Sequence, residues 1–161
     1  MDSYAMAQSS PASSVVSLVC AILTIIAFWK IFTKAGEKGW KAIIPIYNAY
    51  TAYKLFWNKK MFWITFILAF VAVIVGSIGI GSLGVFMAMG AADGVAVLGV
   101  ILTILFVIML IALCVLSIIY YNKLSKSFGH GAGFTVGLIF LNLIFMLILA
   151  FGSSEYKKLE N

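Results

Sequence analysis

The run from Met61 to Asn122 constrains this chain most, because its 62 residues carry a single charged side chain, Asp93. One helix needs only about 20 apolar residues to cross the hydrocarbon core of a bilayer. The run is therefore long enough for two crossings. Near its middle, Asp93-Gly94 is a turn signal. We predict one membrane span at about 61–85 and another at about 95–121, with Asp93 as the N-cap of the later helix.

Composition supports a membrane protein. The chain has 161 residues, of which 64% are hydrophobic and 10% are charged. A soluble domain has about 25% charged residues and roughly 45–50% apolar ones. A chain this short cannot bury so much apolar surface in a core of its own. The lipid bilayer is therefore its predicted partner.

Two further apolar runs, Ser14–Phe32 and Phe134–Phe151, are each close to the hydrocarbon thickness when helical, at about 27–28 Å. The first lacks a basic leader and a small-residue cleavage site, so we interpret it as an uncleaved anchor. We predict an all-α integral membrane protein with four transmembrane helices. The predicted parts are an exposed N-terminal arm (1–13), a membrane domain (14–152) with spans at about 14–32, 61–85, 95–121 and 134–151, and an exposed C-terminal tail (153–161).

The basic residues predict the orientation. All eleven are lysines, and nine of them lie in the loops 33–60 and 122–133 or at the adjoining Lys30. The positive-inside rule then places both loops in the cytoplasm and both termini outside, in the plasma membrane. Nucleic-acid binders favour arginine forks on a polar face, so we expect no nucleic-acid partner.

The segment between the first two spans has the most distinctive pattern. Pro45 suits the first position of a helix, where its missing N–H costs nothing, and this helix would continue to about Trp57. One face would then hold Ile46, Tyr47, Tyr50, Lys54 and Trp57, and the other Asn48, Thr51, Ala52 and Leu55. Two interpretations remain: an amphipathic helix lying in the membrane interface, or a re-entrant element that lines a cavity or docks a partner.

We assign a candidate interaction surface to this segment and to the loop 122–133. Its members are Trp40, Pro45, Tyr47, Asn48, Tyr50, Lys54, Lys126, Gly129 and His130. We expect any site to lie where Trp40, Pro45, Tyr47 and Asn48 meet the loop Lys126–Gly133. His130 is the only histidine and has no ligand-spaced companion, so we predict no metal site, no cofactor and no enzyme activity.

Residues 76–84, GSIGIGSLG, contain the letters of a dinucleotide-binding fingerprint. That motif requires a preceding strand in a soluble βαβ unit, which an apolar run does not provide. We predict instead that Gly76, Ser77, Gly81 and Gly84 pack helices closely. A broken helix that binds an ion or substrate and a fraying span end are the alternatives. We expect Asn142, in the middle of the last span, to hydrogen-bond to a neighbouring helix.

A faint internal repeat is also visible. Lys34-x-Gly36 before Gly39-Trp40 is similar to Lys126-x-x-Gly129 before Gly133-Phe134. A repeated hairpin would explain this, since repeats are common in membrane transporters. Topology alone would also produce two lysine-glycine loops.

The stretches Gly36–Asn48 (GEKGWKAIIPIYN) and Lys126–Gly129 (KSFG), the latter followed by Gly133-Phe134 and Gly137-Leu138, carry a resemblance. Over about residues 15–152 the chain resembles a family of small bacterial and archaeal membrane proteins catalogued as a domain of unknown function. Members of that family are sometimes fused to other envelope domains, including signal-peptidase-like ones. The glycine-rich region 76–94 is longer here than the usual link. The resemblance implies an architecture and no activity.

The function expected from these features is a non-enzymatic assembly, scaffold or accessory component. Its partners would be lipid and other membrane helices, in a homo-oligomer or with another membrane protein. The alternative is a small channel or transporter with a glycine-rich broken second span.

Overall fold

The computed structural model describes residues 11–89 and 93–158, which form helices and no strand. In chain order the elements are α1 (Pro11–Lys34), the 3-10 helix η1 (Gly39–Ala42), α2 (Pro45–Phe56), α3 (Lys59–Met89), α4 (Asp93–Ser127), α5 (Ala132–Phe140) and α6 (Asn142–Phe151). The all-helical class predicted from the sequence is confirmed. Most of the N-terminal arm, the last three residues of the tail and the side chain of Asp93 lie outside the described residues.

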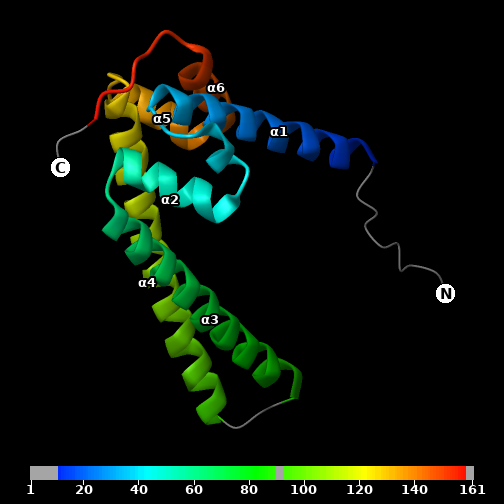
Figure 1. Cartoon of the computed structure of the whole chain (residues 1–161). Helices are drawn as coiled ribbons and strands as arrows, with labels where there is room; N and C mark the ends of the chain where they lie inside the picture. Colours follow the sequence, from blue (N-terminus) through cyan, green and yellow to red (C-terminus); the bar gives the residue numbers. More distant parts are fainter. Residues whose placement is uncertain (1–10, 90–92, 159–161) are drawn as a thin grey trace.

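Helices α3 and α4 form a long antiparallel hairpin that projects from the rest of the molecule (Figure 1). Helix α3 ends at Met89 and α4 begins at Asp93, the first residue of the predicted Asp93-Gly94 turn signal; residues 90–92 lie outside the described residues. Small residues let the two backbones approach: a Cβ on Gly76 would lie 2.8 Å from the Phe106 ring, and one on Gly79 2.9 Å from the backbone of Thr103. Helix α3 is continuous through residues 76–84, so the broken-helix alternative is wrong.

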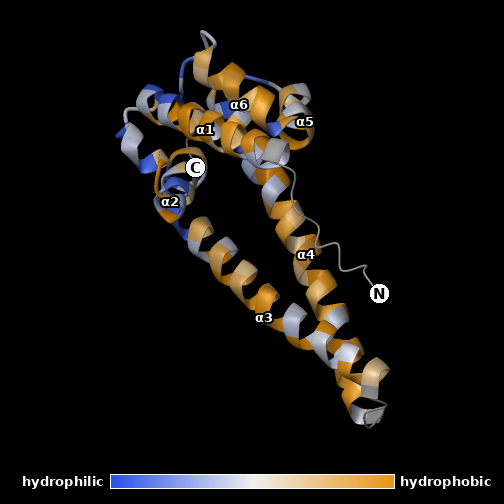
Figure 2. Ribbon diagram, turned by 90° about the vertical axis from the view of Figure 1, so that its right-hand side faces the viewer, coloured by the Kyte–Doolittle hydropathy of each residue, from blue (hydrophilic) through white to orange (hydrophobic). Residues whose placement is uncertain are grey.

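The remaining helices gather at one end of the hairpin as a head. There α1 packs against α6 and η1, while α5 packs against α4 (Figures 1 and 2). The head has a mostly apolar core, in which Thr51, Ser125 and Ser127 are also buried. Its largest fully buried apolar side chains are Ile31, Phe32, Phe56, Leu124, Leu138 and Leu149. Helix α1 runs across the hairpin axis rather than alongside it, so the molecule is not a bundle of parallel spans (Figure 1).

Three helices are long and apolar enough to cross a membrane: α1 from Ser13, α3 and α4. The fourth span, predicted at 134–151, is not one helix. The chain bends at Leu141, whose φ of −122° and ψ of 48° end α5 and begin α6. Helices of 9 and 10 residues are about 14–15 Å long, half the hydrocarbon thickness. A fourth crossing helix is therefore not confirmed.

Two glycines close α1 and α4 in the same way. Gly36 and Gly129 have φ of 76° and 75°, a left-handed conformation that glycine adopts without strain. In each case the following residue donates its N–H back to the third-last helical carbonyl: Glu37 to Phe32 over 2.8 Å, and His130 to Ser125 over 3.0 Å. These are Schellman caps. They give the Lys-Gly similarity a physical basis, although the elements that follow the two caps differ.

The C-terminal tail lies against the two basic loops. The Tyr156 hydroxyl donates to the Leu55 carbonyl at 2.8 Å, and the Lys157 N–H donates to the Ser127 carbonyl at 2.7 Å. A hydrogen bond cannot reach across a bilayer. The described part of the tail therefore lies beside loops that were expected on the other side of the membrane, and its residues Ser153, Glu155, Lys157 and Lys158 are exposed.

Candidate functional site

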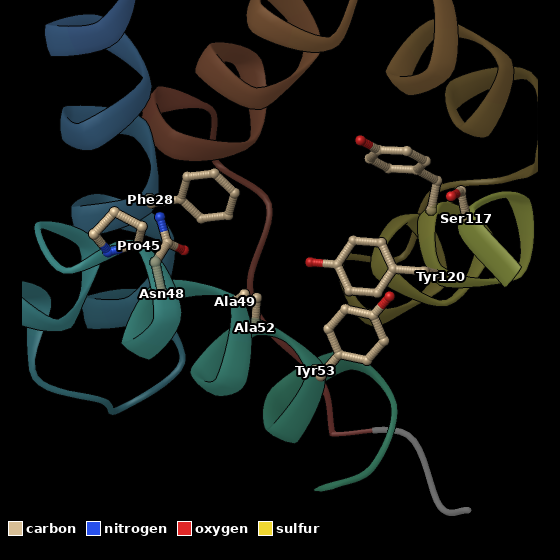
Figure 3. A pocket seen from close by; sticks show the side chains of 9 residues that line it. Phe28, Pro45, Asn48, Ala49, Ala52, Tyr53, Ser117 and Tyr120 are labelled. Atoms are coloured by element: carbon tan, nitrogen blue, oxygen red, sulfur yellow. The ribbon is translucent and has the colours of Figure 1, made fainter. Parts of the chain in front are cut away.

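The head contains a cavity of about 380 Å³ where α1, α2 and α4 meet. Phe28 contributes from α1, Asn48 and Tyr53 from α2, and Ser117, Tyr120 and Tyr121 from α4 (Figure 3). Pro45, Ala49 and Ala52 complete the α2 wall. Its volume is in the range of small-molecule sites, which is about 300–1,000 Å³.

The start of α2 positions the first polar group of this cavity. Pro45 begins the helix after Ile44, which is extended, because proline fixes φ and needs no hydrogen-bond acceptor there. One turn later, Asn48 donates through Nδ2 to the Ala42 carbonyl at 3.3 Å. The side chain is thereby tied to η1, beside Phe28 (Figure 3).

Aromatic stacking positions the remaining polar groups. Tyr53 and Tyr120 stack with ring centroids 4.8 Å apart, and Tyr121 lies edge-on to Tyr120 at 5.5 Å. The Tyr121 hydroxyl accepts a hydrogen bond from Asn142 Nδ2 at 3.1 Å. Within the described residues, the hydroxyls of Tyr53 and Tyr120 have no hydrogen-bond partner.

The cavity is lined by apolar and uncharged polar groups. No lysine, histidine or acid is among the residues that line it. Across the described residues, no group of three His, Cys, Asp or Glu side chains could hold a metal ion. The cavity can therefore donate and accept hydrogen bonds through hydroxyl and amide groups, beside apolar walls.

A separate cluster of charges lies on the outer side of α2. Glu37 accepts hydrogen bonds from Lys41 Nζ, at 2.5 Å, and from Lys54 Nζ. These two ammonium groups hold the pKa of the Glu37 carboxyl below its ordinary value. The cluster fastens the 34–41 loop to α2, and the three side chains remain partly exposed.

The structure divides the predicted interaction surface. Pro45 and Asn48 line the cavity, while Trp40 and Tyr47 pair outside it with ring centroids 5.7 Å apart. Tyr50 packs on the Phe62 ring at 5.4 Å. Lys54 binds Glu37.

The predicted residues of the second loop lie at the end of α4. Lys126 and Gly129 are exposed, and the His130 ring stacks on the Phe134 ring at 4.2 Å. The loops meet through Phe56 and Phe128, at 6.1 Å, and not near Trp40 and Tyr47 as expected. The partner that sequence reasoning missed is the Ser117–Tyr121 turn of α4.

The predicted packing residues also divide. Gly76 faces α4, and Asn142 bonds Tyr121 on a neighbouring helix. Ser77, Gly81 and Gly84 are exposed on the outer face of α3, and a Cβ added at either glycine would meet nothing within 4 Å. Within the hairpin, Gly79 and Gly99 supply the close approach instead.

Comparison with known protein families gives a match to the C-terminal part of the chain. Residues 99–158 match the model of a family of unknown function (DUF5684). The match covers most of α4, all of α5 and α6, and the Lys126–Gly129 stretch, but it does not reach the Gly36–Asn48 signature. No curated protein and no solved structure matches the chain.

Proposed function

We propose that this protein is a non-enzymatic structural component of a membrane assembly, built by self-association of its α3–α4 hairpin. The observation that carries the proposal is how little of the hairpin is covered. Only 17% of the α3 span and 6% of the α4 span are buried. The rest is apolar surface that must face lipid or another helix.

A small-residue stripe on this surface favours a second copy of the chain as the partner. Ser77, Gly81 and Gly84 lie on one helical face of α3, pointing away from α4. In lipid, the hydrophobic effect does not drive helices together. Van der Waals packing between closely approaching backbones does, and small residues permit that approach. The same stripe on two copies is self-complementary about a two-fold axis, the commonest symmetry of dimers.

The test is dimerisation of the full-length protein in liposomes, measured by energy transfer between labelled copies. A Cβ at Gly81 or Gly84 would meet no atom within 4 Å, so Gly81→Leu and Gly84→Leu should spare the hairpin and weaken dimerisation by roughly tenfold, or about 1.4 kcal/mol. The matched control is Gly94→Leu, which is equally open but outside the stripe. Transfer that is unchanged in the stripe variants, or absent in the wild type, would overturn the proposal.

The lysine-rich end supports an orientation for this assembly. We propose that the head faces the cytoplasm at the plasma membrane, because the loops 33–60 and 122–133 hold most of the lysines. Helix α2 would lie at the headgroup boundary. Its exposed side chains Ile46, Tyr47 and Lys54 suit that boundary, while Thr51, Ala52 and Phe56 are buried in the head.

A further inference from the structure

We propose that the cavity between α1, α2 and α4 binds the uncharged polar head of a membrane lipid, of the diacylglycerol kind. The head would present a hydroxyl and ester carbonyls, with its acyl chains left in the bilayer. This proposal is independent of hairpin self-association, because none of the cavity residues lies on the stripe of Ser77, Gly81 and Gly84.

Two unpaired hydroxyls are the first reason. Tyr53 and Tyr120 are fixed by their mutual stacking, and their hydroxyls have no protein partner among the described residues. The Tyr120 hydroxyl points across the cavity toward the side where Phe28 and Asn48 lie (Figure 3). Both tyrosine side chains line the cavity, so a ligand carbonyl or hydroxyl placed there would hydrogen-bond to hydroxyls that have no competing protein partner.

Asn48 supplies a complementary acceptor. Its Nδ2 is committed to the Ala42 carbonyl, which leaves Oδ1 to accept a hydrogen bond. The cavity therefore presents tyrosine donors on one side and an amide acceptor on the other. A glycerol group that carries both a free hydroxyl and ester carbonyls matches this pair.

The absence of charge in the lining selects the class of lipid. A phosphate inside this cavity would lose its water without gaining a lysine, which is costly. Glu37, Lys41 and Lys54 are paired with one another, and none of them lines the cavity. Neutral heads are therefore favoured over phosphorylated ones.

The apolar walls account for the rest of the molecule. Phe28, Pro45, Ala49 and Ala52 line the cavity beside its polar groups. Ala49 is exposed, so it lies at the rim. The volume of about 380 Å³ holds a head and the first acyl carbons, but not two full chains.

The experiment uses full-length protein in lipid nanodiscs with a diacylglycerol that carries a photoreactive group on the first carbons of one chain. The comparison probe is phosphatidic acid with the same chains and the same photoreactive group. We expect diacylglycerol to label peptides that contain Asn48 or Tyr120, and phosphatidic acid to label them several-fold less. Equal labelling by both probes, or labelling only outside the cavity, would overturn the proposal.

Variants separate head recognition from contact with any acyl chain. Tyr120→Phe keeps the stacked ring and removes one hydroxyl, so we expect roughly five-fold weaker labelling. Tyr50→Phe is the matched control, because Tyr50 is on α2 but outside the cavity. Ala49→Phe should block the rim. If Tyr120→Phe and Ala49→Phe are labelled as strongly as the wild type and have wild-type melting temperatures, the cavity does not bind the lipid head.

Discussion

Glu37 shows how single side chains hold the first loop. It is the only acid between the first two long helices, and it accepts hydrogen bonds from two lysines. The Schellman cap at Gly36 fixes the position of Glu37 just after the end of α1. The chain direction changes at this cap, and Lys54, 17 positions further on, then reaches the Glu37 carboxylate.

The first prediction is that Glu37→Gln removes a pH-dependent part of stability. The folded-state pKa of Glu37 lies below its ordinary value of 4.5. Its contribution is therefore present above pH 4.5 and is lost as pH falls through the lowered pKa. At pH 7 we expect the variant to lose about 0.5–1 kcal/mol. Thermal unfolding in detergent at pH 7 and pH 3 measures the difference, and an equal deficit at both values would contradict it.

The second prediction concerns the two capping glycines. A Cβ at Gly36 or Gly129 meets no atom, so only the left-handed backbone opposes alanine. Each alanine variant should lose about 1–2 kcal/mol. Gly131→Ala is the control, because that site is equally open and has a φ of −91°. Equal unfolding midpoints for the three variants would show that the caps do not determine stability.

At the scale of the elements, α3 carries glycines that pack against α4 and glycines that face away from it. Gly76 and Gly79 face α4, while Gly81 and Gly84 face outward. Periodicity alone does not distinguish them, because every face of α3 is apolar. Packing against the partner helix makes the distinction.

The third prediction follows from this division. Gly79→Leu places a side chain against the Thr103 backbone, which cannot rotate away, so α3 and α4 must separate. We expect a loss of roughly 1–3 kcal/mol, as for overpacked cores. Gly81→Leu should leave the fold unchanged. Resistance to denaturation by a harsh detergent, compared for the two variants, gives the measurement, and equal behaviour would argue against the observed hairpin register.

Sequence predicted the elements whose signals are local. The proline start of α2 and the start of α4 near Asp93 were both predicted within a few residues, because proline and Asp-Gly act on their own backbone. The bend at Leu141 was missed, since no proline marks it and the run of 18 apolar residues has the length of a span. Hydropathy reports transfer into lipid and contains no information on helix direction.

The candidate site was only half predictable for the same reason. The 36–54 segment supplied Pro45 and Asn48, whose chemistry is visible locally. Tyr120 and Tyr121 come from 70 or more positions further along the chain. Their pairing with α2 depends on how α4 crosses the head, which one sequence does not reveal.

At the scale of the whole molecule, the tail links segments that are far apart in the sequence. Its hydrogen bonds to Leu55 and Ser127 gather the two basic loops and the C-terminal segment at the head end of the hairpin. Burial of the Tyr156 ring raises the pKa of its hydroxyl, which therefore stays protonated as the donor to Leu55.

The fourth prediction is a labelling pattern, after replacement of Cys20 and Cys114 with alanine. Single cysteines at Lys38 and Glu155 should react with an impermeant reagent from one side of the membrane. A cysteine at Gly94, near the hairpin tip, should react only from the other. Reaction of positions 38 and 155 from opposite sides would restore the four-span arrangement.

The Lys34 side chain also orders events during synthesis. Its ammonium group donates to the carbonyls of Leu149 and Gly152 at 2.8 and 2.6 Å, capping α6 from 115–118 residues earlier in the chain. At roughly 5–20 residues per second, a ribosome needs about 6–24 s to make the intervening chain. The hairpin depends on contacts within residues 59–127 and can pack during that interval. The head can pack only after the last residues have been made, so the hairpin must insert into the membrane before the head assembles.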